Sequence, residues 1–293
     1  MNSSAERSPL LQPAPEILAL VDRAIQEDLA LGDATTEALI PPDLQGTAIL
    51  LSKSTGILCG CPFALMVFQR IDPTLKTELF LHEGASLEPK QTIAKVYGSI
   101  ASILMGERTA LNILQHLSGI ASATALYVQA IHGTPARVID TRKTLPGLRN
   151  LEKYAVRTGG GHNHRRNLGD GVLIKDNHIA AMRSQGMSLA QIIQQARTNT
   201  SHTLQIEVEV DSISEAQEAL EAGAGLILLD NMSPDQMKQV AELAQGQAIL
   251  EASGGINLET VRAVAESGVD LISVGALTHS AQALDISLDF VDS

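Results

Sequence analysis

The first part of the chain combines short β-rich runs with stretches of helical spacing. Apolar residues recur at helical intervals from Ile17 to Ile25 and again over 62–71, which predicts two amphipathic helices. The runs expected to form short strands are 47–52, 79–82 and 92–97. A longer helical pattern covers 102–131, with Gly119 as the expected interruption. These elements predict a small α+β unit followed by a long helix.

The second half has a stricter rhythm, in which an apolar run ends in polar residues and a helical pattern follows. Six such runs occur, at 136–139, 171–174, 204–208, 226–229, 248–250 and 271–274. Because unbroken apolar strands are buried on both faces, they indicate a parallel sheet with helices outside it. No G-x-G-x-x-G motif follows a strand, so we expect a closed α/β barrel and not an open dinucleotide-binding sheet.

Two of the helices between these runs have recognisable start signals. The helix over 212–222 begins at the capping residue Ser212, with Glu215 at capping-box spacing. The helix over 234–243 begins at Ser233, with Pro234 in its first position. We therefore expect both helices to start at these residues.

Charged residues or glycines follow every predicted strand of the second half. In chain order they are Asp140, Thr141, Arg142 and Lys143; Lys175; Glu207 and Glu209; Asp230; Glu251, Ser253, Gly254 and Gly255; and Gly275. In parallel α/β folds the ligand site forms at the carboxyl ends of the strands. This face of the barrel is therefore the predicted active site.

Composition restricts the kind of ligand and the compartment. The 293-residue chain is 44% hydrophobic, which is ample for a buried core, and its net charge is −12 with 2% aromatic residues. Nucleic-acid binding is disfavoured, since basic faces and stacking aromatics are scarce. No apolar run of about 18 residues or signal peptide occurs, so we expect a cytoplasmic protein with a frayed leader over 1–14. Cys59 and Cys61 are expected to be reduced packing thiols.

One stretch reverses the acidic balance of the chain. Between Arg137 and Lys175 lie nine of the 21 Lys and Arg residues against three acids, a local balance of +6, while the rest carries −18. This contrast predicts a site for a polyanion. The cations expected to meet it are Arg142, Lys143, His164, Arg165 and Lys175. Arg149, Lys153 and Arg157 have helical spacing and are expected to form a solvated helix face instead.

Glycines and acids complete the predicted site. The triplet 159–161 can bring backbone close to a ligand or can form only a flexible turn. The segment 253–256, before a helix starting near Leu258, together with 274–276 matches a barrel phosphate site. Glu209 and Asp230 could hold ribose hydroxyls or Mg²⁺, and a role for Glu207 stays open because it shares their face. A zinc site from His162, His164 and His178 is disfavoured by its spacing and by the surrounding cations.

Ten motifs together resemble the quinolinate phosphoribosyltransferase family over nearly the whole chain. They are GDATT at 32–36, ERTALN at 107–112, LSGIA at 117–121, DTRKTLPGLR at 140–149, GGGHNHR at 159–165, LIKDNHI at 173–179, EVE at 207–209, LDN at 229–231, SGGI at 253–256 and VGA at 274–276. The resemblance implies a small N-terminal α/β domain of the open-faced sandwich kind over 15–115 and a six-stranded α/β barrel over 116–279. The alternation over 284–290 suggests that 280–293 returns to the first domain as a strand.

By this resemblance the enzyme would transfer phosphoribosyl from phosphoribosyl pyrophosphate to quinolinate with decarboxylation, in NAD biosynthesis. Its cofactor would be Mg²⁺, with no tightly bound organic cofactor, and it would be a homodimer in which Arg108 reaches the partner's site. The residues implied to be catalytic are Arg142, Lys143, His164, Arg165 and Lys175. Those implied to bind substrate are Arg108, Thr141, Arg142, Lys143, Arg165, Lys175, Glu209, Asp230, Ser253, Gly254, Gly255, Val274, Gly275 and Ala276, and Glu209 and Asp230 are the candidate metal ligands.

Two other functions are compatible with parts of this pattern. Lys175 at a barrel strand end could form the imine of a Schiff-base aldolase. The chain could also be a non-catalytic binding module, or a relative acting on another anion, as in the paralogues associated with molybdate transport. The complete set of cations favours the enzyme acting on a dicarboxylate.

Overall fold

In the computed structural model of the protein, residues 15–291 are described, so the expected leader over 1–14 lies outside the described residues. The chain divides into two compact units. Unit 1 holds the described residues up to Gln115 together with those from Asp285 onward, and unit 2 holds His116–Leu284. Within the described range, no helix has the length and apolar character needed to cross a membrane.

Unit 1 is built on an antiparallel sheet whose strand order is β12-β1-β5-β3. The strands of this sheet are β1 (Gln45–Ser52), β3 (Lys76–Leu79), β5 (Thr92–Ser99) and β12 (Ile286–Val291), and a separate two-stranded sheet is formed by β2 (Gly56–Ile57) and β4 (Ser86–Leu87). The helices are α1 (Pro15–Leu29), α2 (Ala34–Leu39) and α3 (Cys61–Ile71). Alternate β1 residues Ala48, Leu50 and Ser52 are fully buried, as a strand with one covered face requires. The strand expected over 79–82 was placed too late, since β3 ends at Leu79.

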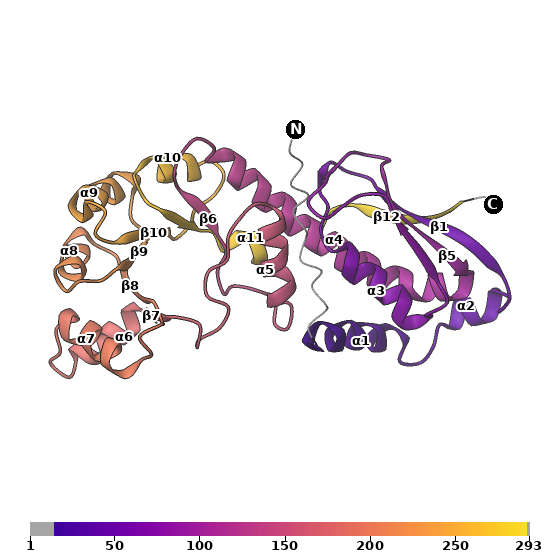
Figure 1. Cartoon of the computed structure of the whole chain (residues 1–293), viewed down its shortest axis with the longest axis horizontal. Coiled ribbons are helices and arrows are strands. Elements are labelled where there is room, and N and C mark those ends of the chain that lie inside the picture. The colour runs from indigo at the N-terminus through magenta and orange to yellow at the C-terminus, as the bar shows by residue number, and fades with distance from the viewer. Residues whose placement is uncertain (1–14, 292–293) are drawn as a thin grey trace, which may run out of the picture. The chain divides into compact units, whose positions relative to one another are not determined.

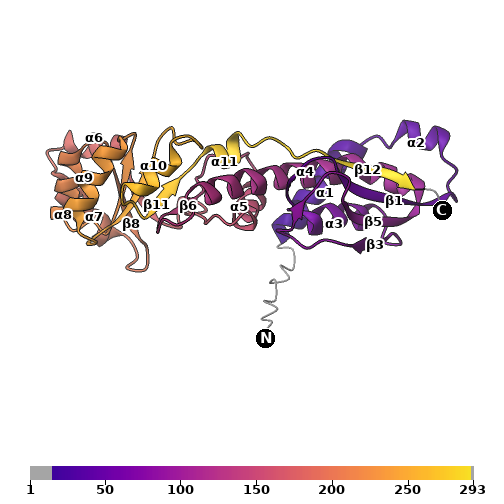
Figure 2. The same ribbon diagram turned by 90° about the horizontal axis from the view of Figure 1, so that it is seen from above.

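The end of the chain supplies an edge strand to unit 1. β12 pairs antiparallel with β1 from Thr47↔Val291 to Ser52↔Ile286, and Figure 2 shows the two strands side by side. The expectation that the terminal alternation forms a strand of the first domain is confirmed. Residues from the two ends of the sequence therefore share one ladder.

Helix α4 (Ile100–Ala130) is continuous over 31 residues, so the expected interruption at Gly119 was wrong. A Cβ at Gly119 would lie 2.0 Å from the backbone oxygen of Gln282. A glycine is needed here because another segment passes close to the helix. The low helix propensity of glycine is outweighed by the helical turns on either side of it.

Unit 2 contains the six parallel strands, in the order β6-β11-β10-β9-β8-β7. The strands are β6 (Arg137–Ile139), β7 (Val172–Ile174), β8 (Ile206–Val210), β9 (Leu226–Asp230), β10 (Ile249–Ser253) and β11 (Leu271–Ser273). The helices are α5 (Arg149–Thr158), α6 (Asp176–Arg183), α7 (Leu189–Asn199), α8 (Ile213–Glu221), α9 (Pro234–Ala244), α10 (Val261–Glu266) and α11 (Ala276–His279). Figure 1 shows α8, α9 and α10 on the outer side of these strands. All six predicted strands are present, although β8 is shifted toward later residues.

Within the described residues, no ladder joins the two end strands of the six, so the expected barrel is present without hydrogen-bonded closure. β6 and β7 are the two ends of the described sheet order. Ile139 of β6 instead forms a parallel bridge with His162, whose N–H donates to Val138 O at 2.9 Å. The segment 162–165, here called the seam segment, thus takes the place beside β6 that another strand would occupy.

Helix starts agree with the sequence in part. Ser233 caps α9 in a complete capping box with Gln236. Ser212 accepts from the Glu215 N–H, but the Glu215 carboxylate binds Arg183 at 2.9 Å, so the expected capping box is incomplete. Helix α10 begins at Val261, later than the expected start near Leu258.

Candidate active site

A cavity of about 560 Å³ lies at the carboxyl ends of the unit 2 strands. All six strands bring residues to it, either from their last positions or from the loop that follows. The lining residues are Thr141, Arg142, Lys143, His164, Arg165, Leu173, Lys175, Glu209, Leu228, Asp230, Asn231, Glu251, Ser253, Gly254, Gly255 and Ser273. The structure therefore gathers most of the predicted site residues around one cavity.

The guanidinium groups of Arg142 and Arg165 form a part of the cavity wall that is suited to binding anions. The Nε atom of Arg142 is buried and has no hydrogen-bond partner among the residues that the structure describes. Burial lowers the pKa of the Arg165 guanidinium, and the neighbouring positive charge of Arg142 lowers it further. Arg165 is oriented by a 2.8 Å hydrogen bond from Nη1 to Gly171 O. Since an unpartnered buried donor costs about 1–3 kcal/mol, a bound anion that accepts from Arg142 would relieve this cost.

Another part of the cavity lining combines a cation with acids. Lys175 Nζ forms an ion pair with Glu209 Oε2, and the Lys175 side chain is 45% exposed. Asp230 Oδ2 accepts a hydrogen bond of 2.7 Å from Asn231 Nδ2. Asn231 was missed in the sequence analysis; its φ of 55° is in the left-handed region, where asparagine is favoured among side-chain-bearing residues.

The two segments predicted to bind phosphate, 253–256 and 274–276, differ in their position relative to the cavity. Gly254 has a φ of 97°, and a Cβ there would lie 2.2 Å from Asn231 Oδ1, so only glycine fits this turn of the lining. Val274, Gly275 and Ala276 do not line the cavity among the described residues. Gly275 instead lies behind Lys143, because a Cβ at Gly275 would be 3.0 Å from Lys143 Cδ. The last strand end therefore supports Lys143 from behind.

His164 lies between the cavity and two buried glutamates. Its Nδ1 accepts from the Arg165 N–H at 2.7 Å, so the ring proton is on Nε2, which lies 3.1 Å from Glu207 Oε2 and 3.6 Å from Glu251 Oε2. Burial raises the pKa of Glu251 well above its usual range, and the charge of Glu207 raises it further. The other oxygens of these glutamates, Glu207 Oε1 and Glu251 Oε1, are buried and accept no hydrogen bond from any described residue.

These three side chains are also the one group of potential metal ligands found among the described residues. A metal-bound histidine normally donates from its second nitrogen, whereas the Nδ1 of His164 accepts. The arrangement is therefore poorly suited to a metal. His178, which was considered with His164 for zinc, instead accepts from Lys175 N at the start of α6, at 2.9 Å.

Two sequence interpretations near the cavity were wrong. Lys153 was assigned to a solvated helix face, yet it is 2% exposed and forms an ion pair with the fully buried Asp140. Of the three residues assigned to that face, Arg157 alone is exposed. The triplet 159–161 was interpreted as a close approach to a ligand or as a flexible turn, but a Cβ at Gly159 would lie 2.3 Å from Ala121 O and one at Gly161 2.8 Å from Thr124 Cγ2. These glycines permit close packing against α4.

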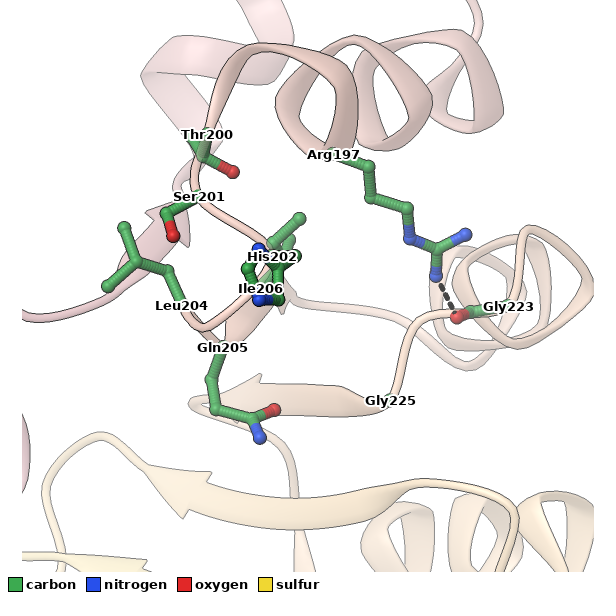
Figure 3. Close-up of a pocket in the computed structure, with 9 residues that line it drawn as sticks. All are labelled: Arg197, Thr200, Ser201, His202, Leu204, Gln205, Ile206, Gly223 and Gly225. Carbon is green, nitrogen blue, oxygen red and sulfur yellow. Dashed lines mark hydrogen bonds between the residues drawn. The ribbon is translucent and has the colours of Figure 1, made fainter.

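A second hollow of about 400 Å³ lies at the amino ends of β8 and β9 (Figure 3). Its wall includes Arg197, Ser201 and His202, and the Arg197 guanidinium donates to Gly223 O. Each of these three side chains is exposed. The hollow thus lacks the buried polar groups that distinguish the cavity at the carboxyl ends.

Arg108 is placed in unit 1, on helix α4. Its side chain is 60% exposed, with Nη2 4.0 Å from Glu107 Oε1. It does not line the cavity of unit 2 within the described chain.

Comparison with known proteins identifies the family. The model of the quinolinate phosphoribosyl transferase N-terminal domain matches residues 33–118, and that of the C-terminal domain matches residues 120–289. The chain belongs to the quinolinate phosphoribosyltransferase family. The two-domain α/β fold expected from the resemblance is that of this family.

Relatives and solved structures agree with this assignment. The chain is 40% identical over 274 residues to a probable nicotinate-nucleotide pyrophosphorylase [carboxylating] from Bacillus subtilis, covering 94% of this chain and 93% of the relative. It is 42% identical over 276 residues to the nicotinate-nucleotide pyrophosphorylase [carboxylating] of Mycobacterium leprae, covering 92% and 95%. The crystal structure of NadC from Streptococcus pyogenes matches with a TM-score of 0.89 and 41% identity, over 94% of this chain and 98% of that one.

Proposed function

We propose that this enzyme transfers the phosphoribosyl group of phosphoribosyl pyrophosphate to quinolinate and removes one carboxylate. The products would be nicotinate mononucleotide, pyrophosphate and CO₂, and the names of its relatives support this reaction. The observation that carries the proposal is the buried, unpartnered Nε of Arg142 in a cavity also lined by Lys143, Arg165 and Lys175. This set of cations suits a dicarboxylate and a pyrophosphate together.

The quinolinate carboxylates would bind on the guanidinium wall. Arg142 and Arg165 offer forked donors, Thr141 a hydroxyl and Lys175 a point charge. Both ring nitrogens of His164 already have hydrogen-bond partners in the protein. His164 would therefore contribute the face of its ring to this wall. Each charge-assisted hydrogen bond contributes about 1.5–3 kcal/mol, so several are enough to hold the small diacid.

The phosphoribosyl pyrophosphate would occupy the rest of the cavity. Backbone N–H groups of Ser253, Gly254 and Gly255 would seat the 5-phosphate, with Val274, Gly275 and Ala276 supporting that end. Lys143 would face the phosphates as a point charge. Glu209 and Asp230 would hold the ribose hydroxyls or the metal.

Mg²⁺ fits this set of donors, because it is commonly bound by one or two carboxylates together with substrate phosphates. Glu209 and Asp230 are two of the three carboxylates that line the cavity, and they lie on the adjacent parallel strands β8 and β9, whereas the third, Glu251, is almost completely buried. When bound, Mg²⁺ would neutralise charge on the departing pyrophosphate. We expect chelation of divalent cations to abolish turnover and Mg²⁺ to restore it.

The protein's contribution to the chemistry is position and charge. The cavity walls would hold the pyridine nitrogen against the ribose C1, which gains cationic character as pyrophosphate departs. After the C1–N bond forms, the ring nitrogen is cationic, and its positive charge stabilises the electron pair that stays on the adjacent ring carbon when the C–CO₂ bond breaks. A proton from solvent then replaces CO₂ on the ring. No dedicated general base is needed in this scheme.

A coupled assay tests the proposed activity. The purified enzyme is given phosphoribosyl pyrophosphate, Mg²⁺ and either quinolinate or nicotinate, and both nicotinate mononucleotide and CO₂ are followed. We expect product from quinolinate alone, with equal amounts of nucleotide and CO₂. Product from nicotinate alone would contradict the dicarboxylate site, and no product from either acid would favour a binding module.

Arg108 is proposed to complete the site of a second copy of the chain in a homodimer. Its exposed guanidinium is free to contact another molecule, and it stands in one of the motifs shared with the family. Arg108→Ala and Arg142→Ala chains, each inactive alone, should regain activity when mixed, because a mixed dimer contains one intact site. Equal inactivity of the mixture would contradict this arrangement.

A further inference from the structure

We propose that the buried ion pair of Asp140 and Lys153 is the device that positions His164 and Arg165 for quinolinate. The inference rests on the proposed role of these two residues in binding the diacid. It concerns two side chains that do not line the cavity. Asp140 follows β6, Lys153 lies in the middle of α5, and the seam segment passes between them.

The ion pair holds both backbone polar groups of His164. The His164 N–H donates to Asp140 Oδ1 at 2.8 Å, and the His164 carbonyl accepts from Lys153 Nζ at 3.0 Å. The same Lys153 Nζ donates to Asp140 Oδ1, which closes a triangle of contacts around this one residue. The peptide plane on each side of His164 is therefore fixed by a charged partner.

Asn163 extends the same network. Its Nδ2 donates to Asp140 Oδ2 at 2.6 Å and to Lys153 O at 2.9 Å. On the other side, Asp140 N donates to His162 O at 3.1 Å. His162 thus binds β6 and the residue after it, while Asn163 and His164 bind both Asp140 and Lys153 of α5.

This network replaces the support that a neighbouring strand would give. β6 and β7 do not pair in the described sheet. The seam segment, which carries His164 and Arg165, therefore has no ladder of hydrogen bonds on its β7 side. Directly after His164, the Arg165 N–H donates to the His164 ring at 2.7 Å. A rotation of the His164 backbone would therefore displace both the imidazole and the Arg165 guanidinium.

Stability alone does not account for such a pair. Desolvation of a buried ion pair often offsets its mutual attraction, and well-packed apolar residues are frequently as stable. In agreement with a large desolvation cost, burial lowers the pKa of Lys153 and raises that of Asp140, while each partner opposes the shift of the other. We therefore attribute the role of the ion pair to the backbone geometry that it imposes on His164 and Arg165.

Steady-state kinetics of Lys153→Met test the inference, with Arg157→Met as the matched control on the exposed face of the same helix. The KM for quinolinate should rise about 10- to 100-fold, the equivalent of one lost charge-assisted contact, while the KM for phosphoribosyl pyrophosphate stays within about two-fold. Arg157→Met should leave both constants unchanged. Asn163→Ala, which removes a neutral member of the network, should show the same selectivity with a smaller rise if Lys153→Met fails to fold.

Arg165→Lys separates failure of this inference from failure of the site assignment. A selective rise in the quinolinate KM for Arg165→Lys, with no change for a folded Lys153→Met or for Asn163→Ala, would overturn the positioning role alone. A parallel rise in both KM values for the network variants would indicate a merely structural role and would also overturn it. An unchanged quinolinate KM for Arg165→Lys would overturn the site assignment and the inference with it.

Discussion

The close approach of Gly159 to helix α4 predicts that Gly159→Ala destabilises the protein for steric reasons alone. The φ of Gly159 is −77°, which alanine adopts without strain. Its Cβ would nevertheless lie 2.3 Å from Ala121 O and 2.7 Å from Thr124 Cβ. The nearest atom is the backbone oxygen of a helix, so it cannot move aside without displacing α4.

The size of the effect follows from two opposing terms. Overpacking of this kind costs about 1–3 kcal/mol, and contacts this short favour the upper end. Gly→Ala also restricts the unfolded chain, which returns about 0.4–1 kcal/mol. The net loss is therefore about 2 kcal/mol, which corresponds to a fall in Tm of about 4–8 °C for a domain of this size.

Thermal unfolding of Gly159→Ala and Gly225→Ala would measure this difference. Gly225 is the matched control, because its φ is not in the left-handed region and a Cβ there would meet nothing within 4 Å. We expect Gly225→Ala to keep or slightly raise the Tm, opposite in sign to Gly159→Ala. Equal Tm values for Gly159→Ala and the wild type would refute the packing role of this glycine.

Two further predictions concern the cavity. Arg142→Ala should lower kcat/KM by about 10²–10⁴, because two charge-assisted contacts with the substrate are lost. The Tm should be retained, because the Arg142 Nε has no partner among the described residues. Normal turnover of this variant would show that Arg142 is not part of the site. Glu251 has a pKa raised above its usual 4.5 by burial, so the native state binds more protons than the unfolded state and stability should fall as pH rises above that value. Glu251→Gln should therefore be more stable than the wild type in urea unfolding at pH 8, and an unchanged pH dependence would contradict this.

The six strands and the location of the site could be predicted because their signals are local. Buried parallel strands are apolar throughout, and the residues that follow them meet at one edge whatever the details of packing. Arg142, Lys175 and Asp230 line the cavity for this reason. Their exact partners, such as Glu209 for Lys175, depend on neighbouring strands and could not be inferred from spacing.

The errors concern residues whose environment is set by a distant segment. Lys153 shares helical spacing with Arg157, and only the position of Asp140 beneath α5 makes one buried and the other exposed. Gly119 and Gly159 look like interruptions or flexible turns, whereas each accommodates a backbone that approaches from elsewhere. Closure of the barrel was also overestimated, because strand number does not determine whether the first and last strands meet.

The pairing of β12 with β1 has a consequence for the order in which the protein can fold. During synthesis, residues up to Gln115 emerge before unit 2, but the strand that covers β1 is made only after all of unit 2. Until then β1 is an open edge, with a row of N–H and C=O groups available to other chains. The unit that leaves the ribosome first is therefore the one that must wait for residues 286–291 to be synthesised before its sheet is complete.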